Sequence, residues 1–211
     1  MKFERARTNQ QIENRKKEII KACSDLYDQY DIEGINLKAI GEITSFSRST
    51  IYNYYECKED ILLDVFYQDI LVWSKAINTI VEGYETLTVE LYCKKLTNSL
   101  VQNKRLLKLM SLVYTTLEKA CSLEKLITFK TNIKPLMAPH IKAIDQFFPQ
   151  ASQEAKHIFF INSNAFILGL YPMTHPTEKQ QAAMDAANYP YDLEMFETLC
   201  YSGLLTLAKD L

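Results

Sequence analysis

Four side chains that can bond to phosphates and to base edges are grouped between positions 48 and 53. They are Arg48, Ser49, Tyr52 and Asn53. In the major groove arginine pairs best with guanine and asparagine with adenine, so Arg48 and Asn53 are predicted to read bases. The side chains predicted to hold phosphates are Thr50, Tyr52, Tyr54 and Lys58. The alternative is an ordinary solvent-facing set, because every short amphipathic helix has a polar face.

The stretch NLKAIGEITSFSRSTIYNYYECKED, residues 36–60, contains the elements that would position these groups. Asn36 is a good cap for a short helix whose apolar residues repeat at helical spacing. Ser47 caps a second short helix after a tight turn, and Ile51 and Tyr55 fall one turn apart on its inner side. Two short helices joined in this way form a helix-turn-helix, whose second helix enters the major groove.

A basic segment precedes this stretch. The first 21 residues contain seven Lys or Arg against three Asp or Glu, although the whole chain has a net charge of −2. A basic arm beside a helix-turn-helix fits contact with phosphates, and a solvated N-terminus is the other interpretation. The predicted DNA-contacting set is completed by Lys16, Lys17, Asn36 and Ser47.

From about Arg15 to Val65 the sequence resembles the TetR-type transcriptional regulators. The most specific part is SRSTIYNYYECKEDIL, residues 47–62, which is similar to the recognition helix of that family and the start of its fourth helix. Some positions depart from the usual pattern, among them Ile35 and Asn36, which replace a frequent Thr-Thr. Asp31 stands where a glycine commonly ends the first helix, and Ser45 replaces a turn glycine, which matters if that turn needs a positive φ.

The resemblance implies a homodimeric repressor that a small apolar or amphipathic effector releases from a palindromic operator. It implies an effector pocket in the middle helices, although most apolar residues there are simply core. The candidates for its lining are Trp73, Met110, Tyr114, Phe129, Met137, Phe147 and Phe166. It also implies a dimer interface built from the last two long helices, with packing inside one protomer as the alternative. The candidates for that interface are His157, Ile158, Ile161, Ala165, Phe196, Leu199, Gly203 and Leu204.

Composition and periodicity predict an all-α protein. Of 211 residues, 47% are hydrophobic and only 5 are glycine, and no alternating Val/Thr-rich runs occur. We expect a DNA-binding domain over residues 1–57 and a helical-bundle effector-binding and dimerisation domain over residues 58–211. No signal peptide and no membrane-length apolar run is found, so we expect a cytoplasmic protein.

The helical pattern predicts a first helix over residues 9–30 and a long one over 58–82, ended by Gly83. Further helices are predicted over 88–102, 104–120, 123–148, 152–170 and 191–208. Pro135 and Pro139 should kink or split the third of these. Thr177 and Gln180 have capping-box spacing, which predicts a short helix there.

Catalytic and metal-binding chemistry has little support in the sequence. Glu154 and His157 have the E-x-x-H spacing of di-iron bundles, but such sites need a second motif and two more glutamates. The five cysteines lack CxxC spacing and are expected to be reduced, although a redox-sensing role for one of them stays open. We therefore expect no cofactor and no metal. The rival functions are a DNA-binding fold that acts through protein partners and, less favoured, an all-helical enzyme.

Overall fold

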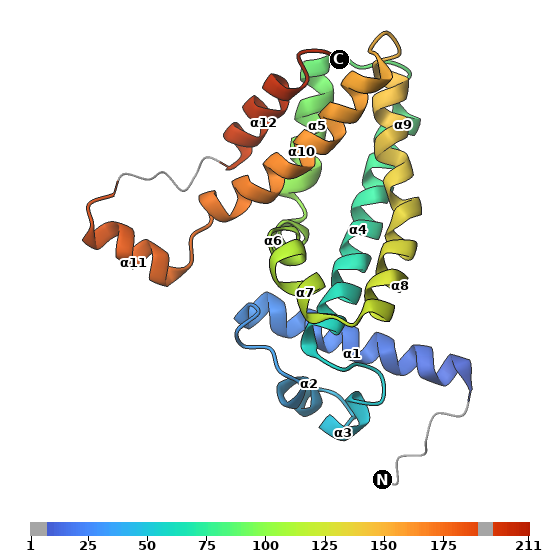
Figure 1. The fold of residues 1–211 in the computed structure, drawn as a ribbon, viewed down its shortest axis with the longest axis vertical. Helices are drawn as coiled ribbons and strands as arrows, with labels where there is room; N and C mark the ends of the chain where they lie inside the picture. Colours follow the sequence, from blue (N-terminus) through green and yellow to red (C-terminus); the bar gives the residue numbers. More distant parts are fainter. Residues whose placement is uncertain (1–7, 190–195) are drawn as a thin grey trace. The chain divides into compact units, whose positions relative to one another are not determined.

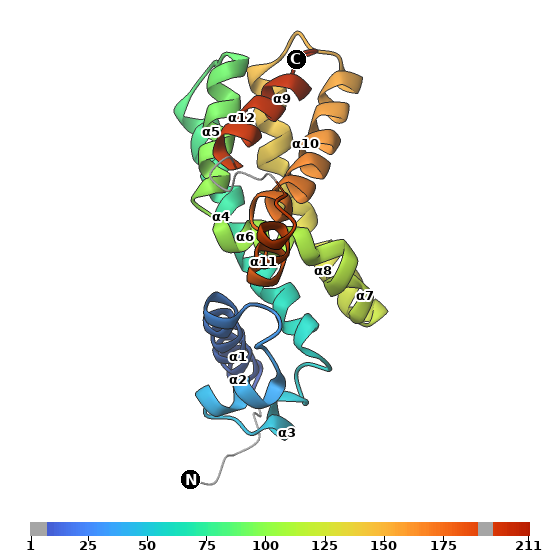
Figure 2. The ribbon, with the colours of Figure 1, turned by 90° about the vertical axis from the view of Figure 1, so that its left-hand side faces the viewer.

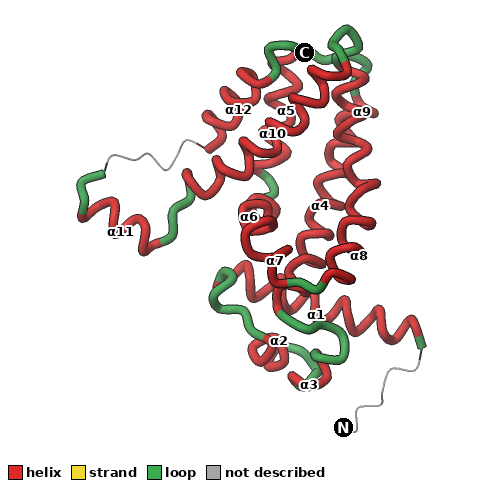
Figure 3. Tube along the Cα trace, viewed as in Figure 1, coloured by secondary structure: helices red, strands yellow, loops and turns green. Residues whose placement is uncertain are grey.

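The computed structural model describes residues 8–189 and 196–211, and every regular element in these ranges is helical (Figures 1 and 3). The predicted all-α fold is therefore confirmed. The helices are α1 (Asn9–Tyr30), α2 (Leu37–Ile43), α3 (Arg48–Ile51), α4 (Lys58–Gly83), α5 (Val89–Val101), α6 (Lys104–Leu112), α7 (Glu118–Ala120), α8 (Leu123–Ile133), α9 (Ala138–Phe147), α10 (Gln153–Thr174), α11 (Glu178–Ala186) and α12 (Phe196–Leu207). In the described ranges, no helix combines the length and hydropathy needed to cross a bilayer.

The chain forms two compact units, and each unit combines two stretches that are separated in the sequence. One unit combines the residues up to Gln68 with Val113–Thr131, and the other combines Asp69–Leu112 with Asn132–Leu211. Helix α4 therefore begins in the first unit and continues in the second. The functional division into residues 1–57 and 58–211 stays a prediction, because compactness alone does not assign a function to either part.

Capping side chains determine where the helices of the first unit begin. Thr8 and Gln11 form a reciprocal capping box at the start of α1, and Asp31 ends that helix with a φ of 56°. The predicted caps are confirmed, since the Asn36 side chain accepts from the amides of Lys38 and Ala39 at the start of α2. The residues with positive φ in the described ranges are Asp31 and Asn188, so Ser45 does not need the conformation that favours glycine.

Buried apolar side chains join the helices of the first unit. Ile19 and Cys23 of α1, Ile40 of α2 and Ile51 of α3 are fully buried, and Tyr55 is 3% exposed. The predicted inward orientation of Ile51 and Tyr55 is therefore confirmed. The Phe66 and Phe129 rings lie 6.0 Å apart, which packs α8 on the first part of α4.

Irregular turns interrupt two of the predicted helices. Residues 134–137 form a 3-10 turn, η2 (Lys134–Met137), between α8 and α9, so the predicted break at the prolines is confirmed. A π-helical turn, η1 (Val113–Leu117), lies between α6 and α7 inside the segment predicted as one helix. The capping box of Thr177 and Gln180 starts α11 as predicted.

The second unit is a bundle in which α12 packs on α5 and α10, and α10 also packs on α6 (Figures 1 and 2). A side chain at Gly203 would collide with the Phe166 ring, so the glycine lets α12 approach α10 closely. Helix α10 extends past its predicted end to Thr174, with Pro172 inside it. The predicted start of the last helix at Tyr191 lies outside the described residues.

Candidate nucleic-acid interface

The polar side chains of residues 47–55, the predicted recognition segment, face outward in the structure. Arg48, Ser49, Tyr52 and Asn53 are all exposed, whereas Ile51 and Tyr55 between and after them are buried. The Arg48 guanidinium donates a hydrogen bond to the Tyr52 hydroxyl over 3.0 Å and lies 5.4 Å from the centroid of its ring. A cation held against an aromatic face is partly fixed in position, which lowers the entropy lost when it engages a base.

Hydroxyl groups organise the start of the same segment. The Ser47 hydroxyl accepts from the Thr50 amide at 3.3 Å, and the two hydroxyls of Ser49 and Thr50 lie 2.9 Å from it. Ser47 therefore acts as the N-cap predicted from the sequence. The regular part of α3 is only four residues long, and the chain continues to Tyr55 in turns closed by backbone hydrogen bonds.

A surface cavity of about 450 Å³ lies beside these residues in the first unit. It brings together four predicted contact residues, Asn36, Arg48, Tyr52 and Lys58, and adds Lys38, which the sequence reasoning missed. The Lys58 ammonium donates to the Ile32 carbonyl over 2.7 Å, so one of its three N–H groups already has a structural partner.

Residues of α1 support the recognition segment. The Arg15 guanidinium donates to the Tyr54 hydroxyl over 3.4 Å, and the Glu18 carboxylate accepts from the amide and the hydroxyl of Ser45, both at 2.9 Å. Sequence reasoning missed this role of Glu18, because its partner is 27 residues away. The predicted phosphate contacts Lys16 and Lys17 lie on α1, half-buried and exposed respectively.

The seven predicted effector-contacting residues do not form one set in the structure. Tyr114 and Phe129 belong to the first unit, and the other five belong to the second. Tyr114 is 59% exposed and lies under the Lys130 ammonium, and its contact with an effector stays a prediction. Met137 and Phe166 are half-buried, while Trp73, Met110, Phe129 and Phe147 are buried.

Trp73 has a polar environment inside the second unit that the sequence did not indicate. Its indole nitrogen donates to the Ser99 hydroxyl over 2.9 Å, and its ring lies 4.2 Å from the ring of His140. His140 is 5% exposed, and within the described residues its Nε2 atom has no hydrogen-bond partner. Burial lowers the pKa of His140 to about 4, so the ring is neutral at pH 7. Such a group can bond to a polar atom of a ligand.

The predicted dimer residues of α10 form an exposed stripe. Ile158 is 48% exposed and Ile161 49%, and His157 and Ala165 are exposed on the same side of the helix. On α12, Phe196 and Leu204 are buried within the protomer, and their contact with a second copy stays a prediction. Gly203 contacts Phe166 of the same protomer, whereas Leu199 is 37% exposed.

All five cysteines are free thiols, as expected. Burial raises the pKa of Cys57 and of Cys200 to about 11 and that of Cys93 to about 12. Thiols with such pKa values are almost fully protonated at pH 7, and the protonated form is a poor nucleophile. This chemistry does not favour a redox sensor that acts through an activated thiolate.

The outward-facing polar segment, the capped short helices before it and the helical bundle together define the class of helix-turn-helix regulators. Residues 67–208 match the family model described as "Tetracyclin repressor-like, C-terminal domain". The chain therefore belongs to the TetR family of transcriptional regulators, which is a DNA-binding family.

Solved structures share the fold. A TetR-family protein of Mesorhizobium loti has 14% sequence identity and a TM-score of 0.54, with 92% of this chain and 95% of that chain covered. A TetR/AcrR-family regulator of Thermobifida fusca has 15% identity and a TM-score of 0.52, with 90% and 98% covered. At this identity the likeness shows the fold alone. No curated protein matches the sequence.

Proposed function

We propose that this protein is a homodimeric, sequence-specific repressor that binds a palindromic operator and leaves it when a small apolar or amphipathic effector binds. One observation carries the DNA-binding part of the proposal. Arg48, Tyr52 and Asn53 are exposed on a segment whose other side is fixed in the core by Ile51 and Tyr55. Such a segment offers donors and acceptors to base edges at little cost in ordering.

The exposed stripe on α10 supports the dimer. Ile158 and Ile161 leave about half of their surface in water, and an apolar face of this kind is stabilised when a second copy covers it. A dimer with a two-fold axis presents two recognition segments to the DNA. They can bind two half-sites in successive major grooves, which are about 34–36 Å apart on one face of the DNA. The palindrome in the operator follows from that symmetry.

Trp73 and His140 support an effector site in the second unit. The indole ring offers apolar surface, and the neutral His140 ring offers one unsatisfied nitrogen to a hydroxyl or carbonyl group of the ligand. We propose that residues 1–57 bind DNA and that residues 58–211 bind the effector and dimerise. The effector shifts the equilibrium by its difference in affinity for two states, typically about 1–3 kcal/mol. Helix α4 belongs to both units, so it is our candidate for transmitting the change.

A binding selection tests DNA recognition. Full-length protein is mixed with fragments of its source genome at near-physiological salt, and the retained DNA is sequenced beside that retained by Arg48→Ala. We expect a shared palindrome with the natural protein and a weaker, degenerate one with the variant. Retention that follows charge alone and vanishes with added salt would contradict the proposal.

Fluorescence tests the effector. Trp73 is the only tryptophan of the chain, so a ligand beside His140 changes the emission directly. We expect one ligand to change this emission and to release DNA at the same concentration. If ligands alter the emission without releasing DNA, regulation acts through something other than this site, such as a protein partner.

A further inference from the structure

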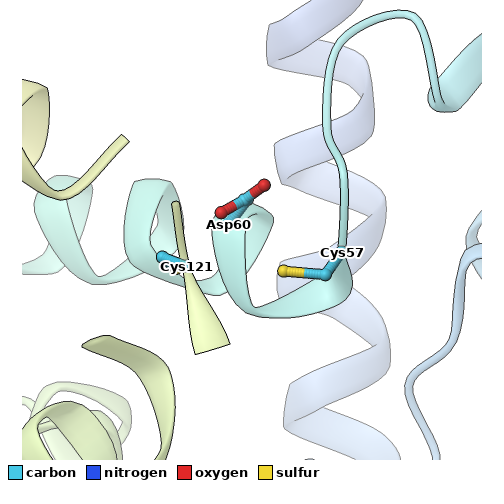
Figure 4. A group of neighbouring side chains, drawn as sticks. All are labelled: Cys57, Asp60 and Cys121. Atoms are coloured by element: carbon cyan, nitrogen blue, oxygen red, sulfur yellow. The ribbon is translucent and has the colours of Figure 1, made fainter. Parts of the chain in front are cut away.

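Three side chains with metal-binding chemistry lie together in the first unit. Cys57 lies directly before α4, Asp60 is on the first turn of α4, and Cys121 follows α7. Figure 4 shows the three side chains as neighbours. Their ligand atoms, two sulfurs and a carboxylate oxygen, all lie within 4.8 Å of one another. No metal was expected from the sequence, because the cysteines lack CxxC spacing, and Cys121 and Cys57 become neighbours only in the folded chain.

The carboxylate of Asp60 is the decisive group. Asp60 is 4% exposed, and its Oδ2 atom accepts from the Glu56 amide at 3.1 Å, which anchors the side chain at the start of α4. In the part of the chain that the structure describes, no donor bonds to the Oδ1 atom. The Glu56 amide satisfies Oδ2 but leaves Oδ1 buried and without a hydrogen bond. A buried oxygen in this state costs stability unless another group binds it.

We propose that Cys57, Asp60 and Cys121 bind a divalent cation of the zinc class. Thiolate sulfur selects zinc-like ions over magnesium or calcium, and a carboxylate oxygen is a common additional zinc ligand. Three protein ligands leave the fourth tetrahedral position to water. The amide of Glu56 holds the carboxylate in the orientation that binding requires, as outer partners do at known metal sites.

The three ligand atoms need to move only a short distance to surround an ion. With Zn–S bonds near 2.3 Å, two sulfurs on a tetrahedral ion are about 3.8 Å apart, so atoms that lie within 4.8 Å of one another need approach by at most about 1 Å. Cys57 and Cys121 are half-buried, and Cys57 would give up a weak contact of 3.9 Å with the Ala120 carbonyl. The Asp60 amide also bonds to the Cys57 sulfur and can go on donating to it when an ion is bound. Cys57 also lines the surface cavity beside Arg48, which gives an ion a route from solvent.

A disulfide between Cys57 and Cys121 is the rival use of these thiols. It would leave Oδ1 of Asp60 as unsatisfied as before, whereas a cation binds both sulfurs and that oxygen. Binding releases the two thiol protons, and the site then has a net charge of −1. Burial and the neighbouring Asp60 carboxylate raise the pKa of Cys121, so the cation must displace the proton of this thiol when it binds.

Zinc binding is measured on the full-length, reduced, metal-free protein without DNA, so the result is independent of the proposed function. We expect one Zn²⁺ per protomer by calorimetry, and thiolate-to-metal absorption when Co²⁺ is the probe. Cys57→Ser, Cys121→Ser and Asp60→Asn should each weaken Zn²⁺ binding by more than about tenfold. Cys200→Ser is the matched control, because Thr97 can bond to the new hydroxyl, and its affinity should not change.

Alkylation of the natural protein keeps the test decisive if a variant fails to fold. Zn²⁺ should slow the modification of Cys57 and Cys121, mapped by mass spectrometry, and leave that of Cys93 unchanged. The proposal is wrong if Zn²⁺ does not bind stoichiometrically, if it protects neither cysteine, or if the folded Asp60→Asn variant binds as tightly as the natural protein. Recovery of a Cys57–Cys121 disulfide from a protein that takes up no zinc would assign these thiols to redox chemistry instead.

Discussion

Arg48 and Tyr52 are bound to each other on the exposed side of the recognition segment, with 3.0 Å between guanidinium nitrogen and hydroxyl oxygen. Residues four apart on a helix lie on the same side, so the pair follows from the local geometry. The hydroxyl accepts from Arg48 and can still donate its own proton to a phosphate. The same tyrosine can therefore orient a base-reading side chain and contact the DNA backbone.

Arg48→Ala should weaken binding to the selected operator by about 1–3 kcal/mol and relax preference at one base pair, because the proposed bidentate contact of Arg48 to guanine is lost. Fluorescence anisotropy on the operator and on single-base variants of it measures both effects. Tyr52→Phe keeps the aromatic surface under Arg48 and removes the hydroxyl, so it should lower affinity without changing the preferred base. An unchanged sequence preference in Arg48→Ala would remove Arg48 from the base-reading set.

Replacement of Ile161 by glutamate should dissociate the proposed dimer, since a charge on a stripe covered by a second copy would lose its hydration. Ile141→Glu is a matched control, because both isoleucines are 49% exposed in the protomer and Ile141 lies on α9. Sedimentation should give monomers for Ile161→Glu and dimers for Ile141→Glu. Dimers in both variants would place the interface elsewhere.

His140 should make the protein less stable in mild acid. Its pKa is about 4 when folded and about 6.5 when unfolded, so between these values the unfolded chain binds a proton that the native state does not. Stability therefore falls as the pH falls through this window, by at most about 3 kcal/mol. Urea unfolding of the natural protein and of His140→Phe at about pH 7 and about pH 5 measures the difference. The His140→Phe variant should lose less stability than the natural protein when the pH falls from about 7 to about 5. Equal losses would mean that His140 is accessible to protons in the folded state.

Gly203→Ala should lower the free energy of unfolding by about 1–3 kcal/mol, because the new methyl group displaces the Phe166 ring. Gly169→Ala is the comparison, since a Cβ atom there meets nothing in the protomer. Thermal unfolding of the two variants separates close packing from helix propensity. A stable Gly203→Ala protein would show that Phe166 moves aside without cost.

Local chemistry made much of the fold predictable. Asn36 and Ser47 bond to amides within three residues of themselves, and Pro135 acts on its own helix, so their effects are visible in the sequence. Which side chains of a helix are buried and which are exposed was harder to predict. Phe196 and Leu199 are three residues apart and equally apolar, yet only the packing of α12 decides that the first is buried and the second exposed.

The parts that escaped prediction depend on distant partners. Ser45 meets Glu18, Trp73 meets His140, and Cys57 meets Cys121 only after the chain has folded. No local pattern marks such pairs, because the two residues are far apart in the sequence and their spacing is unrelated to the helical repeat. The polar groups of the recognition segment were found because they share one short, capped element.

If the exposed stripe of Ile158 and Ile161 pairs two protomers as we propose, the dimer has a further consequence for gene dosage. Where protomers are too dilute to pair fully, the amount of dimer rises with the square of the protomer concentration, so doubling synthesis gives about four times as much dimer. The cell could then sharpen or relax control by changing copy number alone, before any ligand enters. An autoregulated promoter would use that steepness to hold the protein near its pairing threshold.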